Sequence, residues 1–181
     1  MYKTLVTLTQ LLNDDLRLAF GLTEDVAFLC PVKEAGSSLS SNKVCVSLVN
    51  VERETGGGIQ FRYKSSEQDY VQKIRPPWYL NIYVLIAAVF PEKQYPESLH
   101  LFSGILSFLQ KNNLLVIPDN AEPVSVEPVN LSMQELSNLW SICGGSYYPS
   151  VLCKIRVLPV DGQEMTGLAA GIKNEELKMK N

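Results

Sequence analysis

Apolar side chains recur at helical spacing near the start of the chain. They lie three or four positions apart and so share one face of a helix: Leu5, Leu8, Leu12 and Leu16. Gly21 follows, and glycine is the residue that most often ends a helix. The pattern predicts an amphipathic helix over residues 4–20.

Further along the chain the apolar positions alternate instead. Alternation over residues 44–49, and again over 59–64, is typical of strands with one face in the core. Three glycines at residues 56–58 stand between the two segments and can adopt the positive φ angles of a tight connection. The sequence therefore predicts a β-hairpin over residues 43–63.

The middle of the chain predicts a loop, a strand and a helix. Residues 65–77 are polar and end in two prolines, which cannot donate to a strand ladder. The apolar run from Tyr79 to Val89 is rich in β-branched and aromatic residues and predicts a buried strand. A helix is predicted from Tyr95 to Asn112, with Pro96 in its first turn. Its expected apolar stripe consists of Leu99, Phe102, Leu106 and Leu109.

The clearest helix start lies at Ser132. Glu135 follows three positions later, so each residue's side chain can bond the other's exposed backbone N–H in a capping box. Gly144 and Gly145 end this helix, and alternation from Val151 predicts a further strand. One face of the helix is apolar: Leu136, Leu139, Trp140 and Cys143.

Hairpin-linked strands with helices in separate blocks predict an α+β fold. We expect a mainly antiparallel sheet flanked by about three α-helices, with short strands between residues 114 and 129. A chain of 181 residues corresponds to one domain, which we place at residues 1–161. Residues 162–181 have no strong period, and we expect them to form a flexible or partner-ordered tail.

Charge and hydropathy exclude several classes of protein. The net charge is −3 and the 16 Lys and Arg residues are scattered, whereas a nucleic-acid binder needs clustered cations. The longest apolar run, residues 82–90, is too short for a membrane span. Charged residues interrupt the N-terminal segment where a signal peptide requires an apolar core. We therefore expect a cytoplasmic protein.

The chain has few residues of the types that form catalytic or metal-binding sites. Its four cysteines are widely spaced and His100 is the only histidine, so neither a metal site nor a cofactor is expected. We expect the cysteines to be reduced, buried thiols. His100 fits a helix surface better than a catalytic base, and the glycines at 56–58 lack the lysine of a phosphate loop. The sequence predicts no enzyme.

Trp140, Tyr147 and Tyr148 allow two interpretations. They can form an aromatic binding surface, or Trp140 can pack in the core beneath the following strand. The first interpretation leaves open a small cytosolic ligand-binding module or enzyme with its site at these residues.

Several short segments resemble the cap, or tail-terminator, proteins of phage-tail-like extracellular contractile injection systems. Their order and spacing over residues 3–161 carry the resemblance. The segments are Val49-Asn50-Val51-Glu52, Pro77, Leu80-Asn81-Ile82-Tyr83, Tyr95, Leu99, Ser103, Phe108-Leu109-Gln110, Leu139-Trp140, Tyr148-Pro149-Ser150-Val151 and Ile155-Arg156-Val157.

The resemblance implies a tail-terminator-like fold and a structural role. Such caps close the distal end of the inner tube and sheath, assemble in the cytoplasm and then form part of the particle. The implied partners are five further copies in a hexameric ring, sheath and tube subunits, and a second cap paralogue. A baseplate or adaptor role in the same machine is the alternative. We expect Trp140, Tyr147 and Tyr148 at a subunit interface, and Arg62 and Lys64 beside a strand edge that accepts a sheath arm. Longer family members carry an extended C-terminal domain, and we expect no such domain after about residue 165 here.

Overall fold

The structure is a computed structural model in which the chain groups into two compact units. The first contains Met1–Glu52 and Leu80–Leu158, and the second contains Arg53–Tyr79 and Pro159–Asn181. The described residues are 1–32, 42–54, 62–65, 70–74, 78–117, 123–160 and 165–170. Side chains are described for 1–32, 42–54, 78–117 and 123–156.

The first unit is built on a six-stranded sheet in the order β1-β2-β5-β8-β7-β6. β1 is parallel to β2, and β7 is antiparallel to both β8 and β6. The backbone N–H of Asn42, before β2, donates to the carbonyl of Val89 at the end of β5, so these two strands are antiparallel. The strands are β1 (Ala27–Leu29), β2 (Lys43–Arg53), β5 (Trp78–Val89), β6 (Leu114–Leu115), β7 (Val124–Pro128) and β8 (Ser150–Val160).

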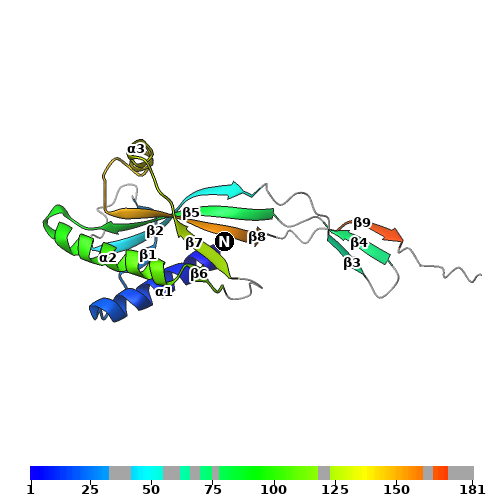
Figure 1. Cartoon of the computed structure of the whole chain (residues 1–181), viewed down its shortest axis with the longest axis horizontal. Coiled ribbons are helices and arrows are strands. Elements are labelled where there is room, and N and C mark those ends of the chain that lie inside the picture. Colours follow the sequence, from blue (N-terminus) through cyan, green and yellow to red (C-terminus); the bar gives the residue numbers. More distant parts are fainter. Residues whose placement is uncertain are drawn as a thin grey trace, which may run out of the picture. The chain divides into compact units, whose positions relative to one another are not determined.

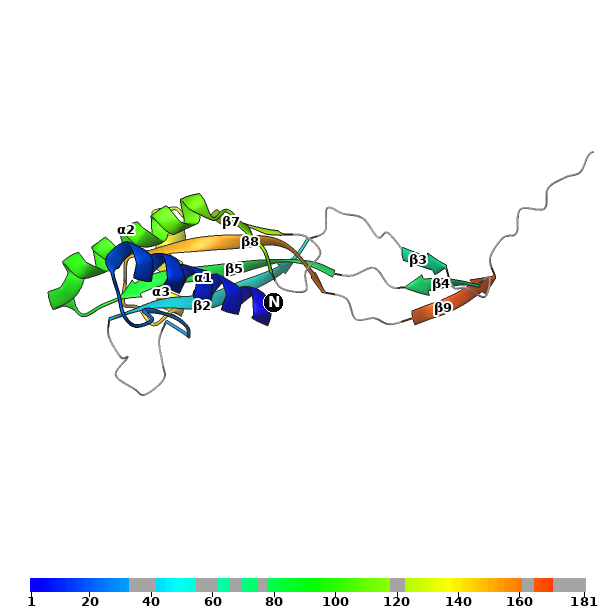
Figure 2. The same ribbon diagram turned by 90° about the horizontal axis from the view of Figure 1, so that it is seen from below.

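Helices cover both faces of this sheet. α1 (Tyr2–Phe20) and α2 (Tyr95–Lys111) lie on one face, and α3 (Met133–Ile142) lies on the other (Figures 1 and 2). A short 3-10 turn, η1 (Glu92–Gln94), leads into α2. The predicted fold class, a mainly antiparallel sheet with three α-helices, is confirmed.

The central strand β5 is continuously apolar from Ile82 to Val89. Its side chains alternate between two buried clusters, one on each face of the sheet. Ile82, Val84 and Ile86 belong to the cluster beneath α1 and α2, which also contains Leu8 and Phe108. The residues facing the α3 cluster are Leu85, Ala87 and Val89. A strand covered on both faces has no position for a polar side chain within this stretch.

The second unit contains a three-stranded antiparallel sheet in the order β3-β4-β9. Its strands are β3 (Arg62–Ser65), β4 (Tyr70–Ile74) and β9 (Met165–Ala170). β4 lies within residues 65–77, so the prediction of a loop over that whole segment is wrong.

The predicted hairpin over residues 43–63 is also wrong. β2 pairs with β1 and β5, whereas β3 pairs with β4 in the other sheet. Alternation reports which face of a strand is buried but not which strand lies beside it. The glycines at 56–58 lie outside the described residues.

Two further predictions differ from the structure in detail. β9 lies within residues 162–181, the segment predicted as a tail; the residues after 170 lie outside the described part. On α2, Leu99 and Leu106 of the predicted stripe are exposed, whereas Leu109 is buried as predicted. The helix also buries Ile105 and Phe108, which the prediction did not include. α2 is apolar on more than one side, so periodicity alone could not select its buried face.

Candidate functional site on helix α3

The start of α3 is fixed by the predicted capping box. The backbone N–H of Glu135 donates to Ser132 Oγ at 3.3 Å, and the N–H of Ser132 donates to Glu135 Oε2 at 2.8 Å. The Ser132 hydroxyl also donates to Glu135 Oε2, at 2.7 Å. This hydrogen bond and the one from the Ser132 N–H hold the pKa of Glu135 below its ordinary value of 4.5, because they favour the charged carboxylate. The first turn of α3 is therefore well defined.

The end of α3 is fixed by two glycines in positive-φ conformations. Gly144 has φ 107° and Gly145 has φ 84°. The N–H of Gly145 donates to the carbonyl of Trp140 at 2.7 Å, and that of Gly144 donates to Ser141, in a Schellman arrangement. The chain reverses here, and the carbonyl of Pro149 accepts a hydrogen bond from the N–H of Ala88 in β5.

This reversal brings three aromatic residues together. The ring of Trp140 lies 5.7 Å from that of Tyr147 and 5.8 Å from that of Tyr148, both in edge-to-face geometry. Such contacts are favourable beyond the apolar area they bury. Trp140 is only 4% exposed and belongs to the core cluster with Leu85, whereas Tyr147 is 58% exposed. Trp140 therefore packs in the core, whereas Tyr147 is exposed; a binding surface at these residues stays a prediction.

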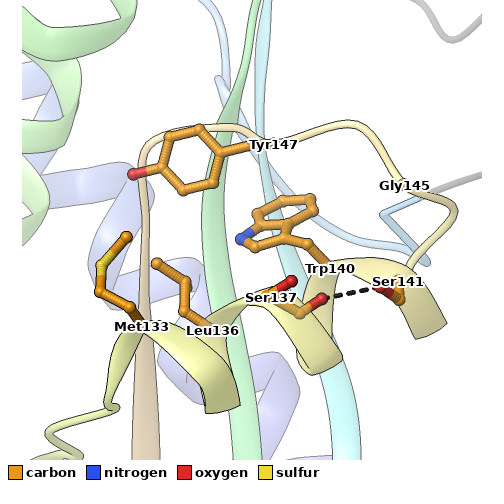
Figure 3. A pocket seen from close by; sticks show the side chains of 7 residues that line it. All are labelled: Met133, Leu136, Ser137, Trp140, Ser141, Gly145 and Tyr147. Carbon is orange, nitrogen blue, oxygen red and sulfur yellow. Dashed lines mark hydrogen bonds between the residues drawn. The ribbon is translucent and has the colours of Figure 1, made fainter.

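A hollow of about 540 Å³ lies between α3 and Tyr147, and we call it the α3 hollow. Figure 3 shows the Tyr147 ring above Trp140, with Met133 and Leu136 along the same side of the helix. None of its lining residues is charged, and Met133 is 81% exposed. The lining consists of Met133, Leu136, Ser137, Trp140, Ser141, Gly145 and Tyr147.

The indole nitrogen of Trp140 is a buried donor without a hydrogen-bond partner among the described residues. Figure 3 shows this nitrogen on the side of the ring that faces Leu136. An unpaired buried N–H costs about 1–3 kcal/mol, so an acceptor that reached it would be stabilising. The hollow thus has an uncharged lining, and this donor lies buried at the Trp140 ring.

The structure brings together three of the five residues predicted at an interface. Trp140, Tyr147 and Tyr148 are in contact, while Arg62 and Lys64 lie on β3 in the second unit. The sequence analysis did not single out Met133 and Ile142, which are 81% and 83% exposed at the two ends of α3. The available signal was an apolar residue at each end of a capped helix, outside its buried face.

The structure also shows the surroundings of the single histidine and of the four cysteines. His100 is exposed on α2, and its ring meets that of Phe20 edge-on at 4.7 Å. Cys45 and Cys153 are fully buried, as predicted, whereas Cys30 and Cys143 are partly exposed. Burial raises the pKa of the Cys153 thiol to about 12.

The described residues contain no group of three or more His, Cys, Asp or Glu side chains arranged to hold a metal ion. Within the same part of the chain, no helix is both long and apolar enough to cross a membrane.

The sequence matches the family model of the Pvc16 N-terminal domain over residues 4–169. The chain therefore belongs to this family. No curated protein sequence matches it.

Two solved structures resemble the chain. The first is the sheath/tube terminator, in the extended state, of PVC, an extracellular contractile injection system. The TM-score is 0.66 at 17% identity, over 97% of this chain and 63% of that one. The second is the tube-terminating cap of the anti-feeding prophage, with a TM-score of 0.64 at 14% identity, over 95% of this chain and 60% of that one.

At these identities the similarity establishes the fold. The chain spans somewhat less than two thirds of the length of either structure.

Proposed function

We propose that this domain is a structural cap, or tail-terminator, subunit of an extracellular contractile injection system. The observation that carries the proposal is the family match over residues 4–169, supported by the fold shared with a sheath/tube terminator and a tube cap. In this role the protein closes the distal end of the inner tube, the sheath or both. Its contribution is binding and not catalysis.

The proposal is tested by locating the chain on an assembled particle. We expect a cryo-EM map to place it as a ring of six at the end opposite the baseplate. Deleting its gene should leave tubes and sheaths of uncontrolled length. A map that places the chain at the baseplate, or a particle that lacks it, would contradict the proposal.

We further propose that the α3 hollow binds a second copy of this chain in that ring. A closed ring uses head-to-tail contacts, so each subunit needs two different complementary patches. The hollow supports one of them because its lining is uncharged and it is bordered by exposed Met133 and Tyr147. Interface centres are depleted in charge and enriched in aromatic residues and Met.

The substitution Tyr147→Ala tests this interface. Truncating an aromatic residue at an interface centre often costs about 2 kcal/mol or more, which corresponds to roughly 30-fold weaker association. Tyr2→Ala is the matched control, because Tyr2 is an exposed tyrosine on α1. We expect only Tyr147→Ala to lower incorporation into particles while circular dichroism stays unchanged. Equal incorporation of both variants would exclude the hollow from the ring contact.

Arg62 and Lys64 lie on β3 and not on the predicted hairpin, and their role at an interface stays a prediction. We propose that they contact a sheath or tube subunit. The double substitution Arg62→Glu with Lys64→Glu should weaken particle assembly most at low salt, since charge contacts are screened as salt rises. Lys93→Glu, at an exposed position in η1, serves as the control. Normal assembly of the double variant would show that neither residue contributes to an interface.

A further inference from the structure

Two cysteines from separate strands meet at the β1 edge of the six-stranded sheet. Cys30 follows the last residue of β1, and Cys45 lies in β2 as the register partner of Phe28. Their Sγ atoms are 3.2 Å apart. The S–S bond of a disulfide is about 2.05 Å long, so the sulfurs need to approach by only about 1.2 Å.

The surroundings hold the two thiols near one another. The N–H of Cys30 donates to the carbonyl of Val46 at 3.2 Å, and Ser47 Oγ donates to the carbonyl of Cys30. Cys45 is fully buried among Leu85 and Trp140, whereas Cys30 is partly exposed. Cys30 is therefore the residue of the pair that is open to an oxidant in solution, and Cys45 is shielded from it.

We propose that Cys30 and Cys45 are a modification site that forms an intrachain disulfide when the protein meets a small oxidised disulfide such as oxidised glutathione. The Cys30 thiolate attacks a sulfur of the oxidant, forming a mixed disulfide and releasing one glutathione thiolate. Cys45 then loses its proton and attacks the Cys30 sulfur, which releases the second glutathione. Two cysteine thiols are oxidised to one disulfide, and one oxidised glutathione is reduced to two thiols.

The bond would fasten the edge strand to its neighbour. β1 has three residues and pairs with β2 over Val44–Val46, so it is held by few ladder hydrogen bonds. A covalent link just beyond its last residue would oppose its separation from β2. Cys143 is the competing partner, because it is partly buried against the same cluster as Cys30 and Cys45.

The test uses the intact wild-type protein. It is fully reduced, incubated with oxidised or reduced glutathione, unfolded in guanidinium with iodoacetamide, digested with trypsin and analysed by mass spectrometry. Cys30 falls in tryptic peptide 18–33 and Cys45 in 44–53, while Cys143 and Cys153 share peptide 112–154. We expect 18–33 joined to 44–53 only after oxidation, with the intact protein lighter by about 2 Da for the two hydrogens lost.

Cysteine variants test which residues form the disulfide and whether it stabilises the protein. Cys143→Ala should still form it, and Cys30→Ser should abolish it. A disulfide between Cys30 and Cys45 closes the loop between these two residues, so it should raise the Tm of the oxidised wild type by about 3–10 °C. The Cys30→Ser variant should show no such shift. The proposal is overturned if oxidation leaves both peptides separately alkylated. The proposal is also overturned if glutathione stays bound to Cys30, or if Cys30 is linked to peptide 112–154.

Discussion

The side chain of Asn13 in α1 hydrogen-bonds both backbone polar groups of Ala27 in β1. Its Nδ2 donates to the carbonyl of Ala27, and its Oδ1 accepts from the N–H of Ala27, each at 2.7 Å. The same Oδ1 accepts from the N–H of Val26 at 2.9 Å. Asn13 is 6% exposed, so these bonds lie away from water and connect the first helix to an edge strand.

Replacing Asn13 should therefore destabilise the domain strongly. Asn13→Ala removes the acceptor of two N–H groups and the donor to one carbonyl, and each buried group left unpaired costs about 1–3 kcal/mol. We expect a loss of about 3 kcal/mol or more in urea unfolding. Asn50→Ala is the control, because Asn50 accepts from Val51 on an exposed part of β2 and should cost about 0.5 kcal/mol or less. Similar losses from the two substitutions would argue against the role of Asn13.

Gly104 marks the close approach of α2 to α1. A Cβ built at this position would lie 2.5 Å from Phe20 Cε2 and 2.9 Å from Leu16 Cδ2. We expect Gly104→Ala to cost about 1–3 kcal/mol by overpacking, despite alanine's better helix propensity. Ser103→Ala, one position earlier on the exposed side of the helix, should be nearly neutral. A stabilised Gly104→Ala variant in thermal unfolding would show that the helices can separate without cost.

The capping box predicts a mutational effect and an acid dependence. Ser132→Ala should cost about 1 kcal/mol, as measured by denaturant unfolding. Because the folded pKa of Glu135 is lowered, its contribution is present above pH 4.5 and is lost as the pH falls through the folded pKa. Glu135→Gln should remove this part of the acid sensitivity. An unchanged pH profile in that variant would contradict the assignment.

Cys153 predicts an alkaline dependence of the opposite sign. Burial raises its folded pKa from 9.0 to about 12, so the unfolded chain ionises first as the pH rises. Stability linked to this thiol is complete below pH 9.0, and it falls by up to about 1.4 kcal/mol for each pH unit above that value. Comparing the free energy of unfolding of the wild type and of Cys153→Ala between pH 8 and pH 11 separates the contribution of Cys153 from that of other groups. Parallel dependences of the two proteins on pH would exclude a contribution of Cys153.

The elements predicted correctly are those whose signals are local. α1 has an apolar stripe followed by glycine, α3 has the Ser132–Glu135 capping box, and β5 has a continuous apolar run. Each signal depends on residues within a few positions of one another, and their order was enough to predict the fold class. The aromatic cluster was partly predictable for the same reason, since a helix and the loop that follows it supply all three rings.

The sequence by itself determined the elements that have local signals, such as α1, α3 and β5, and the family resemblance. The tertiary structure alone decided which strands pair, which side of α2 is buried, and that Cys30 meets Cys45. Strand pairing can join segments far apart in sequence, as where β2 joined β5 and β4 joined β9. The buried side of α2 was settled by contact at Gly104, where the absence of a side chain lets α1 approach. These outcomes depend on packing between distant segments, which periodicity along a single segment does not encode.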